Sequence, residues 1–172
     1  MDCEEGDLMT HRSDSGPAVL AYHGKPELKA AMLAMLAEHE AADQIVQGMY
    51  GPADEWRGGC AIGCLIESIR RIEGLATIEH DSYANIQHYL GVPILLANVV
   101  DATHEALAPD DARTWPRRFL EAMQPGADLS MVCPAWLRAC TAEDAVITSF
   151  YDVTPDVLRR QAEILLTLVR AA

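Results

Sequence analysis

The stretch from Trp56 to Cys64 holds the residues whose types and spacing best suit chemistry. Two thiols, Cys60 and Cys64, stand four positions apart in a segment with three glycines: Gly58, Gly59 and Gly63. If a helix begins here, both sulfurs lie on one face, because positions i and i+4 are neighbours on a helix. A helix N-terminus favours the thiolate, which is the nucleophilic and metal-binding form of cysteine. The stretch therefore predicts a catalytic thiol at Cys60, or two ligands of a tetrahedral metal site.

Close helix packing is the alternative explanation for the same stretch. Cysteine is among the most buried residue types, and glycine lets two backbones approach each other. The spacing of Cys60 and Cys64 also departs from the Cys-x-x-Cys of zinc knuckles and thioredoxin-like redox sites. Both explanations stay open. Each glycine in a helix lowers its stability by up to about 1 kcal/mol relative to alanine. Packing alone explains one or two such glycines more readily than three.

Imidazoles that could complete such a site come from other segments. His39 lies on the apolar face of the first predicted helix, with Asp43 one turn later, and suits an oriented metal ligand or a general base. A core histidine satisfied by Asp43 is the alternative. His80 precedes a short predicted helix. The expected ligands of a transition metal such as zinc or iron are Cys60, Cys64, His39 and His80, and the expected catalytic residues are Cys60 and His39.

Backbone N–H groups at the glycine-rich helix start, around Gly59, suit an anionic ligand. His23 and Lys25 precede the first helix in a short loop, and their side chains also suit an anion. A plain loop leading into a helix is the alternative there. The expected ligand-binding residues are therefore Gly59, His23, Lys25 and Asp43.

Asp101, His104 and Glu105 place two carboxylates and an imidazole within about one helical turn. A di-iron bundle needs a Glu-x-x-His motif on each of two helices and two further carboxylates. The chain offers a single Asp-x-x-His here, so a di-iron site is not predicted. His104, next to Glu105 on an amphipathic helix, is expected on the surface.

Helices must position all of these residues, and the clearest pattern starts at Pro26. The apolar face of this first helix repeats every three or four residues: Leu28, Met32, Met35, His39, Ala42, Val46 and Met49. The segment from Gly48 to Pro52 is expected to end it. Further helices are predicted over residues 59–73, 82–90, 93–107, 110–123, 129–140 and 142–151, and from Thr154 to the end. Pro116 is expected to kink or restart one helix, and Pro134 to interrupt another.

These elements predict an all-α fold, a compact single-domain bundle of seven or eight helices without a sheet. Residues 1–17 are polar and acidic and are expected to form a disordered tail, with one helical domain over residues 18–172. The composition agrees, because half of the residues are hydrophobic and alanine, leucine and methionine are favoured over β-branched residues.

Charge and hydropathy limit the classes of partner and the cellular compartment that are expected. The net charge of −13 comes from 26 acidic and 13 basic residues, which argues against direct binding of nucleic acid and is compatible with a protein partner that has a basic surface. No apolar run approaches the roughly 20 residues that a membrane-spanning helix needs. The acidic start lacks a signal-peptide pattern, and five cysteines are read as reduced thiols, so a cytoplasmic protein is expected.

Three segments resemble a set of uncharacterised small helical proteins of bacteria, phages and prophages. The similar segments are Tyr22-His23-Gly24 with the helix to Asp43, the stretch from Gly59 to Cys64, and much of the region from Leu90 to Ser130. The resemblance carries no established activity. It implies a mobile-element setting, in which small acidic proteins act as inhibitors of host defence.

Three hypotheses follow from the sequence, and whether the chain is an enzyme stays open. The first is a thiol, metal or ligand site built from Cys60, Cys64 and His39. The second is an acidic interaction protein, such as an inhibitor of a host-defence or nucleic-acid-binding protein. The third is a homo-oligomer that uses a methionine-rich face formed by Met32, Met35 and Met49.

Overall fold

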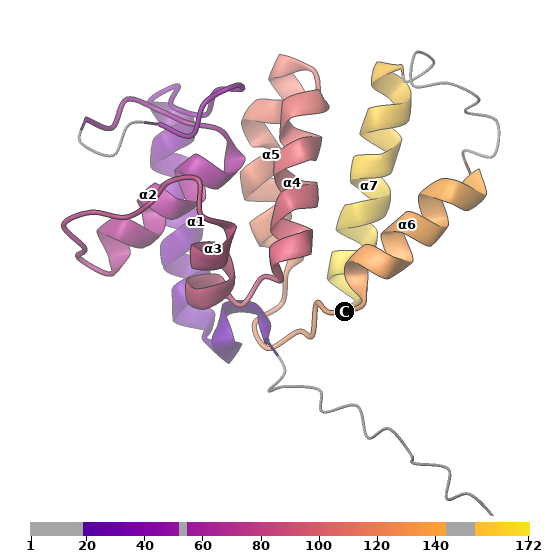
Figure 1. Cartoon of the computed structure of the whole chain (residues 1–172), viewed down its shortest axis with the longest axis horizontal. Helices are drawn as coiled ribbons and strands as arrows, with labels where there is room; N and C mark the ends of the chain where they lie inside the picture. Colours follow the sequence, from indigo (N-terminus) through magenta and orange to yellow (C-terminus); the bar gives the residue numbers. More distant parts are fainter. Residues whose placement is uncertain (1–18, 52–54, 144–153) are drawn as a thin grey trace, which may run out of the picture.

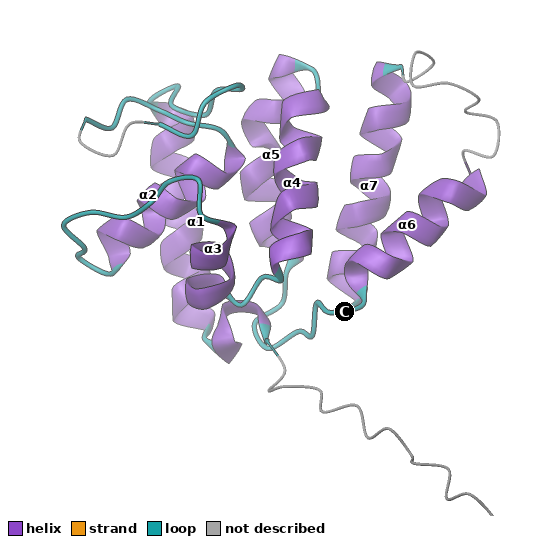
Figure 2. Cartoon of the chain, viewed as in Figure 1, coloured by secondary structure: helices purple, strands orange, loops and turns teal. Residues whose placement is uncertain are grey.

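The computed structural model of the chain describes residues 19–51, 55–143 and 154–172, and in this part the regular elements are helices joined by loops (Figures 1 and 2). Seven α-helices follow one 3-10 turn: η1 (Ala21–Gly24), α1 (Pro26–Ala41), α2 (Ala61–Ile72), α3 (Tyr83–Leu90), α4 (Ile94–Ala106), α5 (Pro109–Ala122), α6 (Val132–Glu143) and α7 (Pro155–Ala171). Two isolated bridges, Leu20 with Asp128 and Ile45 with Gly59, are the extended pairings among the described residues. The predicted all-α bundle is confirmed.

The helices pack in three groups from one side of the molecule to the other (Figure 1). Helix α1 packs against α2 and α5, and α4 packs against α2, α3 and α5. The α6–α7 pair covers the other side of α4 and α5. Helix α4 therefore stands in the middle of the bundle, with the N-terminal half of α2 against it.

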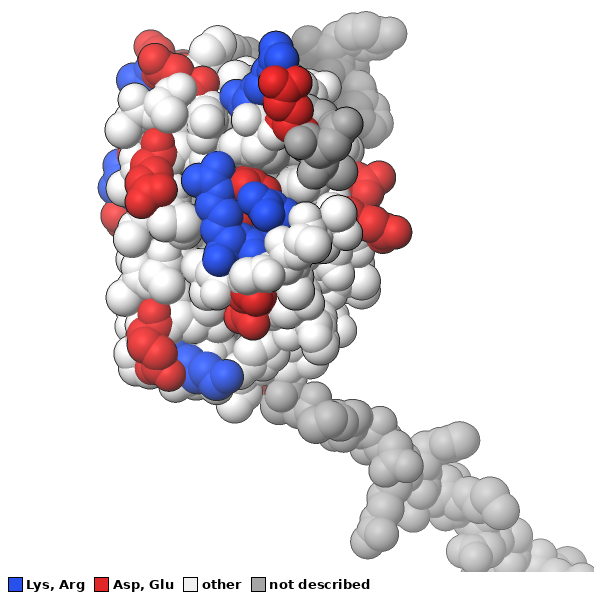
Figure 3. Space-filling view, turned by 90° about the vertical axis from the view of Figure 1, so that its left-hand side faces the viewer, with Lys and Arg blue, Asp and Glu red and all other residues white. Residues whose placement is uncertain are grey.

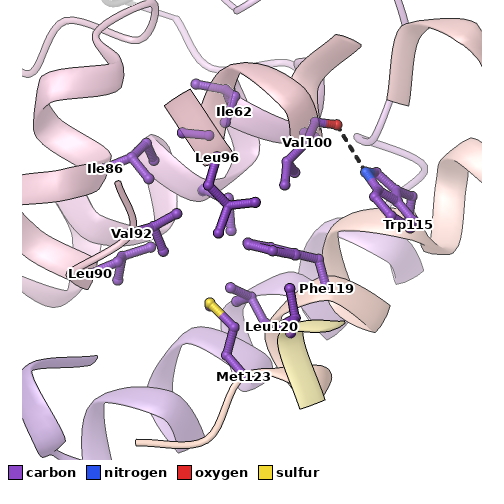
Figure 4. Packing of buried hydrophobic residues seen from close by; sticks show 14 of the residues in the cluster. Ile62, Ile86, Leu90, Val92, Leu96, Val100, Trp115, Phe119, Leu120 and Met123 are labelled. Carbon is purple, nitrogen blue, oxygen red and sulfur yellow. Dashed lines mark hydrogen bonds between the residues drawn. The ribbon is translucent and has the colours of Figure 1, made fainter. Parts of the chain in front are cut away.

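The core is one continuous cluster of buried apolar side chains to which α2, α3, α4 and α5 all contribute (Figure 4). Leu96 and Val100 of α4 face Phe119 of α5, and all three are at most 1% exposed. The indole Nε1 of Trp115 donates to the carbonyl of Val100 at 2.9 Å, which satisfies the one polar atom of this buried side chain. The position of α4 is thus fixed by apolar packing and by a directional hydrogen bond.

Helix α1 ends at Ala41, about two to three turns before the predicted end at Gly48 to Pro52. Asp43 adopts a left-handed backbone (φ 51°), and the N–H groups of Asp43 and Gln44 donate to the carbonyls of Glu40 and His39 at 3.2 and 2.9 Å. This is a Schellman motif with aspartate in the position that glycine usually takes. Because the chain turns here, Val46 and Met49 leave the helix and are partly exposed.

Helix α5 runs unbroken from Pro109 to Ala122 through Pro116, so it does not restart there. Proline has no N–H, so the carbonyl of Ala112 loses its usual helical donor. The Nδ1 atom of His104 lies 3.1 Å from that carbonyl oxygen. Since a carbonyl only accepts, Nδ1 must carry the hydrogen. His104 is therefore fully buried between α4 and α5, and the predicted surface position is wrong.

The other predicted helix ends fit the structure closely. Gly74 and Gly91 follow α2 and α3 with left-handed backbones, and the hydroxyl of Thr154 accepts the N–H of Val157 at the start of α7. Pro134 falls in the first turn of α6 and does not interrupt it. The predicted tail over residues 1–17 and most of the helix predicted over 142–151 lie outside the described residues.

Candidate metal site

The three glycines before and within the start of α2 are explained by a strap, residues 44–51, that crosses this helix start. A Cβ on Gly63 would lie 2.2 Å from the carbonyl oxygen of Tyr50, and a Cβ on Gly59 would lie 2.7 Å from the same atom. A Cβ on Gly58 would lie 2.6 Å from the carbonyl oxygen of Gln44. The close approach that the glycines permit is thus made by backbone of the same chain.

Hydrogen bonds hold the strap in place at both edges. Gly59 donates to the carbonyl of Gln44 and accepts from Val46 N–H, each at 2.9 Å. The side-chain amide of Gln47 donates to the carbonyls of His104 and Leu107 at 2.7 and 2.9 Å, which caps the end of α4. The strap therefore fixes the start of α2 relative to the last turn of α4.

Gly63→Ala tests this arrangement. We expect a loss of about 1–3 kcal/mol in the free energy of unfolding, because the new methyl meets backbone that cannot rotate away. Helix propensity alone would predict a gain of about 1 kcal/mol. Urea unfolding measures the difference. Gly74→Ala is the control, since its Cβ meets nothing within 4 Å and only its left-handed backbone (φ 64°) opposes the change. A stabilised Gly63→Ala variant would contradict the position of the strap.

Cys60 faces α4 rather than the other cysteine. Its sulfur and one carboxylate oxygen each from Asp101 and Glu105 lie within 4.8 Å of one another. Asp101 and Glu105 are one turn apart on α4, and Cys60 is the residue directly before α2. The thiol and the Asp101 carboxylate are buried, at 2% and 6% exposure, whereas Glu105 reaches the surface. This group, which we call the Cys60 site, has one open side.

The Cys60 thiol is protonated in the metal-free protein. Burial raises its pKa above the usual range, and the neighbouring Asp101 carboxylate raises it further. The backbone N–H groups of Gly63 and Ile62 at the helix start lower the pKa, but they do not outweigh burial. The helix N-terminus alone therefore does not activate this thiol, and a thiolate needs a cation in place of the proton.

Asp101 is a buried carboxylate without a positive partner among the described residues. Its Oδ2 atom accepts hydrogen bonds from the hydroxyls of Tyr83 at 2.7 Å and Tyr50 at 3.1 Å. Its Oδ1 atom is buried and accepts no hydrogen bond. Glu105 accepts the N–H of Gly48 at 2.8 Å. Neither carboxylate forms an ion pair with a described basic side chain.

Glu67, the other buried carboxylate among the described residues, has a very different environment. It is 1% exposed and pairs with Arg70 and Arg71, each at 2.7 Å, and with His80 at 3.3 Å. Burial opposes its ionisation, but the hydrogen bonds from these three side chains outweigh that and lower its pKa to about 2. The fold thus neutralises one buried carboxylate completely and leaves Asp101 without a counter-charge.

The predicted partners of Cys60 lie elsewhere. The sulfur of Cys64 donates to the carbonyl of Gly59 at 3.2 Å, and burial raises its pKa to about 12. His80 pairs with Glu67, and its Nδ1 atom is buried without a hydrogen bond. Among the described residues, Cys64, His39 and His80 belong to no group of three potential ligands within 4.8 Å. The structure does not bring the four predicted metal ligands together.

His39 is buried as predicted, but Asp43 is not its partner. Its Nδ1 atom lies 2.8 Å from the side-chain oxygen of Gln44, which also accepts from the indole of Trp56 at 3.2 Å. The Trp56 ring contacts the His39 ring edge-on and stacks on the His80 ring, each with 5.4 Å between centroids. Burial lowers the pKa of His39. None of these side chains belongs to the group formed by Cys60, Asp101 and Glu105.

The predicted ligand-binding residues do not converge. Asp43 is exposed and pairs with Arg113 at 2.9 Å, because the Schellman turn directs it toward α5. His23 is exposed, with Nε2 at 2.9 Å from the carbonyl of His88, and Lys25 is exposed just before α1. Gly59 lies under the strap. These positions provide no common pocket.

Tyr50, Tyr83, Asp101 and Glu105 are the members of the Cys60 site and its surroundings that the sequence did not assign. Asp101 and Glu105 carried a signal, since two carboxylates at i and i+4 share a helix face. Tyr83 starts the short predicted helix beside His80 and could complete a thiol site, but nothing in the sequence required it. Tyr50 carried no signal, because it reaches the site only through the early end of α1 and the course of the strap.

Comparisons with known proteins add no family: no protein-family model, curated protein or solved structure matches the chain. No described helix is long and apolar enough to span a membrane.

On the face shown in Figure 3, acidic side chains form separate groups with basic side chains between them. That face is not one continuous acidic surface.

Proposed function

We propose that the chain binds one divalent transition-metal ion, such as zinc or ferrous iron, through Cys60, Asp101 and Glu105. The observation that carries the proposal is the buried Asp101 carboxylate, which has neither a hydrogen bond at Oδ1 nor a basic partner among the described residues. Buried charges in proteins are paired or coordinate metals. The comparison with Glu67 supports this reasoning. The same fold surrounds Glu67 with two arginines and a histidine, whereas Asp101 has no basic side chain beside it among the described residues.

The donor set selects the class of metal. A thiolate favours zinc and iron over magnesium and calcium, which bind through oxygen alone and need six or more ligands. Three ligands from the protein leave one tetrahedral position for water or substrate. Glu105 marks the solvent side of the site, where that position would be reached. A metal with an open position acts as a Lewis acid, so metal-assisted hydrolysis is the reaction class that this site would support.

Binding is expected to be coupled to loss of the thiol proton. Because burial and Asp101 hold the Cys60 pKa high, the metal must displace that proton, and affinity rises with pH. The three deprotonated ligands would also repel one another without the ion. A metal at this position therefore stabilises the contact between the start of α2 and the end of α4.

Cys60→Ala and Cys64→Ala form a matched pair for the test. Both thiols are buried within one turn of each other, but only Cys60 belongs to the site. We expect Zn²⁺ affinity, measured by competition with a chromophoric chelator, to fall by more than about 100-fold in Cys60→Ala and to stay within about threefold in Cys64→Ala.

Metal analysis of protein purified without a histidine tag gives a separate readout. The expected result is close to one metal ion per wild-type chain and less than one tenth of that in Cys60→Ala. Wild-type protein that neither retains a metal nor binds added Zn²⁺, Fe²⁺ or Co²⁺ would refute the proposal. Equal losses in the two alanine variants would also refute it, because general destabilisation would then explain them.

A further inference from the structure

The two oxygens of the Asp101 carboxylate lie in different surroundings. Oδ2 accepts the Tyr83 hydroxyl at 2.7 Å and the Tyr50 hydroxyl at 3.1 Å, and the two hydroxyl oxygens are 3.0 Å apart. Oδ1 is buried and accepts no hydrogen bond from a described residue. Separately, one Asp101 oxygen, the Cys60 sulfur and one Glu105 oxygen form a group within 4.8 Å of one another. Oδ2 thus accepts two hydrogen bonds within the protein, whereas Oδ1 accepts none from a described residue.

The two tyrosines reach Asp101 from separate parts of the chain. Tyr83 is the first residue of α3, and Tyr50 lies on the strap. Two donors on one oxygen, from two directions, fix the rotation of the carboxylate about its side-chain bonds. A single donor would leave that rotation less restricted.

Both hydroxyls donate a hydrogen bond to a carboxylate oxygen, which acts only as an acceptor. Burial raises the pKa of Tyr83 above the usual range, and the hydrogen bonds to Tyr50 and Asp101 raise it further. For Tyr50, the neighbouring Tyr83 hydroxyl lowers the pKa, but burial and the Asp101 carboxylate outweigh it, so the net pKa is also raised.

We propose that Tyr83, assisted by Tyr50, is the positioning residue of the Cys60 site and holds Asp101 so that it binds a metal through Oδ1 alone. This inference rests on the proposed metal site and adds how that site is pre-formed. Hydrogen bonds to the outer oxygen of a ligating carboxylate fix its geometry and raise metal affinity. The site would then need no rearrangement of Asp101 when the ion enters.

Tyr83→Phe removes the shorter of the two hydrogen bonds and keeps the ring. We expect Zn²⁺ affinity to fall by about 10- to 100-fold, the range typical of outer-shell partners of metal ligands. The absorption bands of the Co²⁺-loaded protein should shift, because Asp101 can then rotate toward a second Co–O contact. Tyr89→Phe is the control, since Tyr89 lies on the same helix and its ring contacts His88 rather than the site. It should change neither readout.

Each outcome separates this inference from the proposed function. Wild-type protein that binds no metal refutes the proposed function. Wild-type binding with unchanged affinity and unchanged Co²⁺ bands in Tyr83→Phe overturns the positioning role and leaves the site standing. A tyrosinate-to-metal charge-transfer band in the Fe³⁺-loaded wild type, lost in Tyr83→Phe, also overturns it, because Tyr83 would then be a ligand.

Tyr50→Phe keeps the test decisive if Tyr83→Phe does not fold, as judged by far-UV circular dichroism. Tyr50 is 37% exposed, so its hydroxyl can be removed with little effect on the core. We expect a smaller loss of Zn²⁺ affinity, of about 3- to 10-fold, since its hydrogen bond to Asp101 is the longer one. Unchanged affinity and Co²⁺ bands in this variant would overturn the assisting role of Tyr50.

Discussion

Asp101→Asn is expected to raise the free energy of unfolding of the metal-free protein by about 1–3 kcal/mol while removing its affinity for metal. The asparagine oxygen can still accept the hydroxyls of Tyr83 and Tyr50, which now meet Oδ2. The amide nitrogen takes the place of Oδ1, which is buried and accepts no hydrogen bond from a described residue. The change therefore replaces an unpaired buried charge by a neutral group with a hydrogen-bond acceptor.

Urea unfolding in the presence of EDTA measures the stability part of this prediction, and Zn²⁺ titration measures the binding part. Asp111→Asn is the matched control, because Asp111 forms a partly exposed ion pair with Arg159 at 2.9 Å. Its loss is expected to cost no more than about 1 kcal/mol and to leave metal affinity unchanged. An Asp101→Asn protein that is less stable than the metal-free wild type would show that the carboxylate is compensated in some other way.

Glu67→Gln is expected to have the opposite sign and to lower the free energy of unfolding by about 2–4 kcal/mol. The neutral amide cannot accept from all three partners, and Arg70, Arg71 and His80 lose the charge that they surround. The cost falls short of a fully buried pair, because the Arg70 and Arg71 side chains remain 28% and 35% exposed. Zn²⁺ affinity should change little, since Glu67 is not part of the Cys60 site.

Glu40→Gln is the matched control for Glu67→Gln. Glu40 also binds an arginine through both oxygens, at 3.0 Å each from Arg117, but its side chain is 21% exposed and has one such partner. We expect a loss of about 1 kcal/mol or less in urea unfolding. Equal losses in the two variants would contradict the special role assigned to the buried network.

The pH dependence of stability follows from the same network. The pKa of Glu67 falls from an ordinary 4.5 to about 2 in the folded protein, so the unfolded chain takes up this proton first as pH falls. The stability due to Glu67 is complete above 4.5 and is lost as pH falls toward 2. Burial also lowers the pKa of His39 below 6.5, which again favours the unfolded chain in acid. Glu67→Gln should therefore lose less stability than the wild type between about pH 7 and pH 3.

The helices could be predicted from the sequence because local signals determine them. The three- and four-residue spacing after Pro26, the glycines at positions 74 and 91, and the Thr154-Pro155 pair each act within a few residues. The early end of α1 could not be predicted, because aspartate at the left-handed position is uncommon and Gly48 offered a more usual stop. The same misplaced end assigned Asp43 to His39 in place of Gln44.

The Cys60 site was predicted in part. The stretch from Trp56 to Cys64 indicated a close approach to the start of a helix and a thiol at that start. Both features are present. The apolar pattern of the first helix predicts that His39 faces inward, but it does not predict which neighbouring side chain His39 contacts. The pattern therefore could not exclude His39 from the site. Asp101 was not assigned to the site, because acidic residues on a helix are usually solvated. The packing of α4 against the start of α2 buries Asp101, and this packing could not be predicted from the pattern of α4.

The hydrogen bond between His104 and the carbonyl that Pro116 leaves free has an evolutionary consequence. Positions 104 and 116 serve the same oxygen, that of Ala112, so a sequence change at one alters what is tolerated at the other. A relative with an ordinary helix former at position 116 no longer needs an imidazole at position 104. A relative that keeps the proline but loses the histidine must supply another donor. When relatives are aligned, these two positions are expected to vary together.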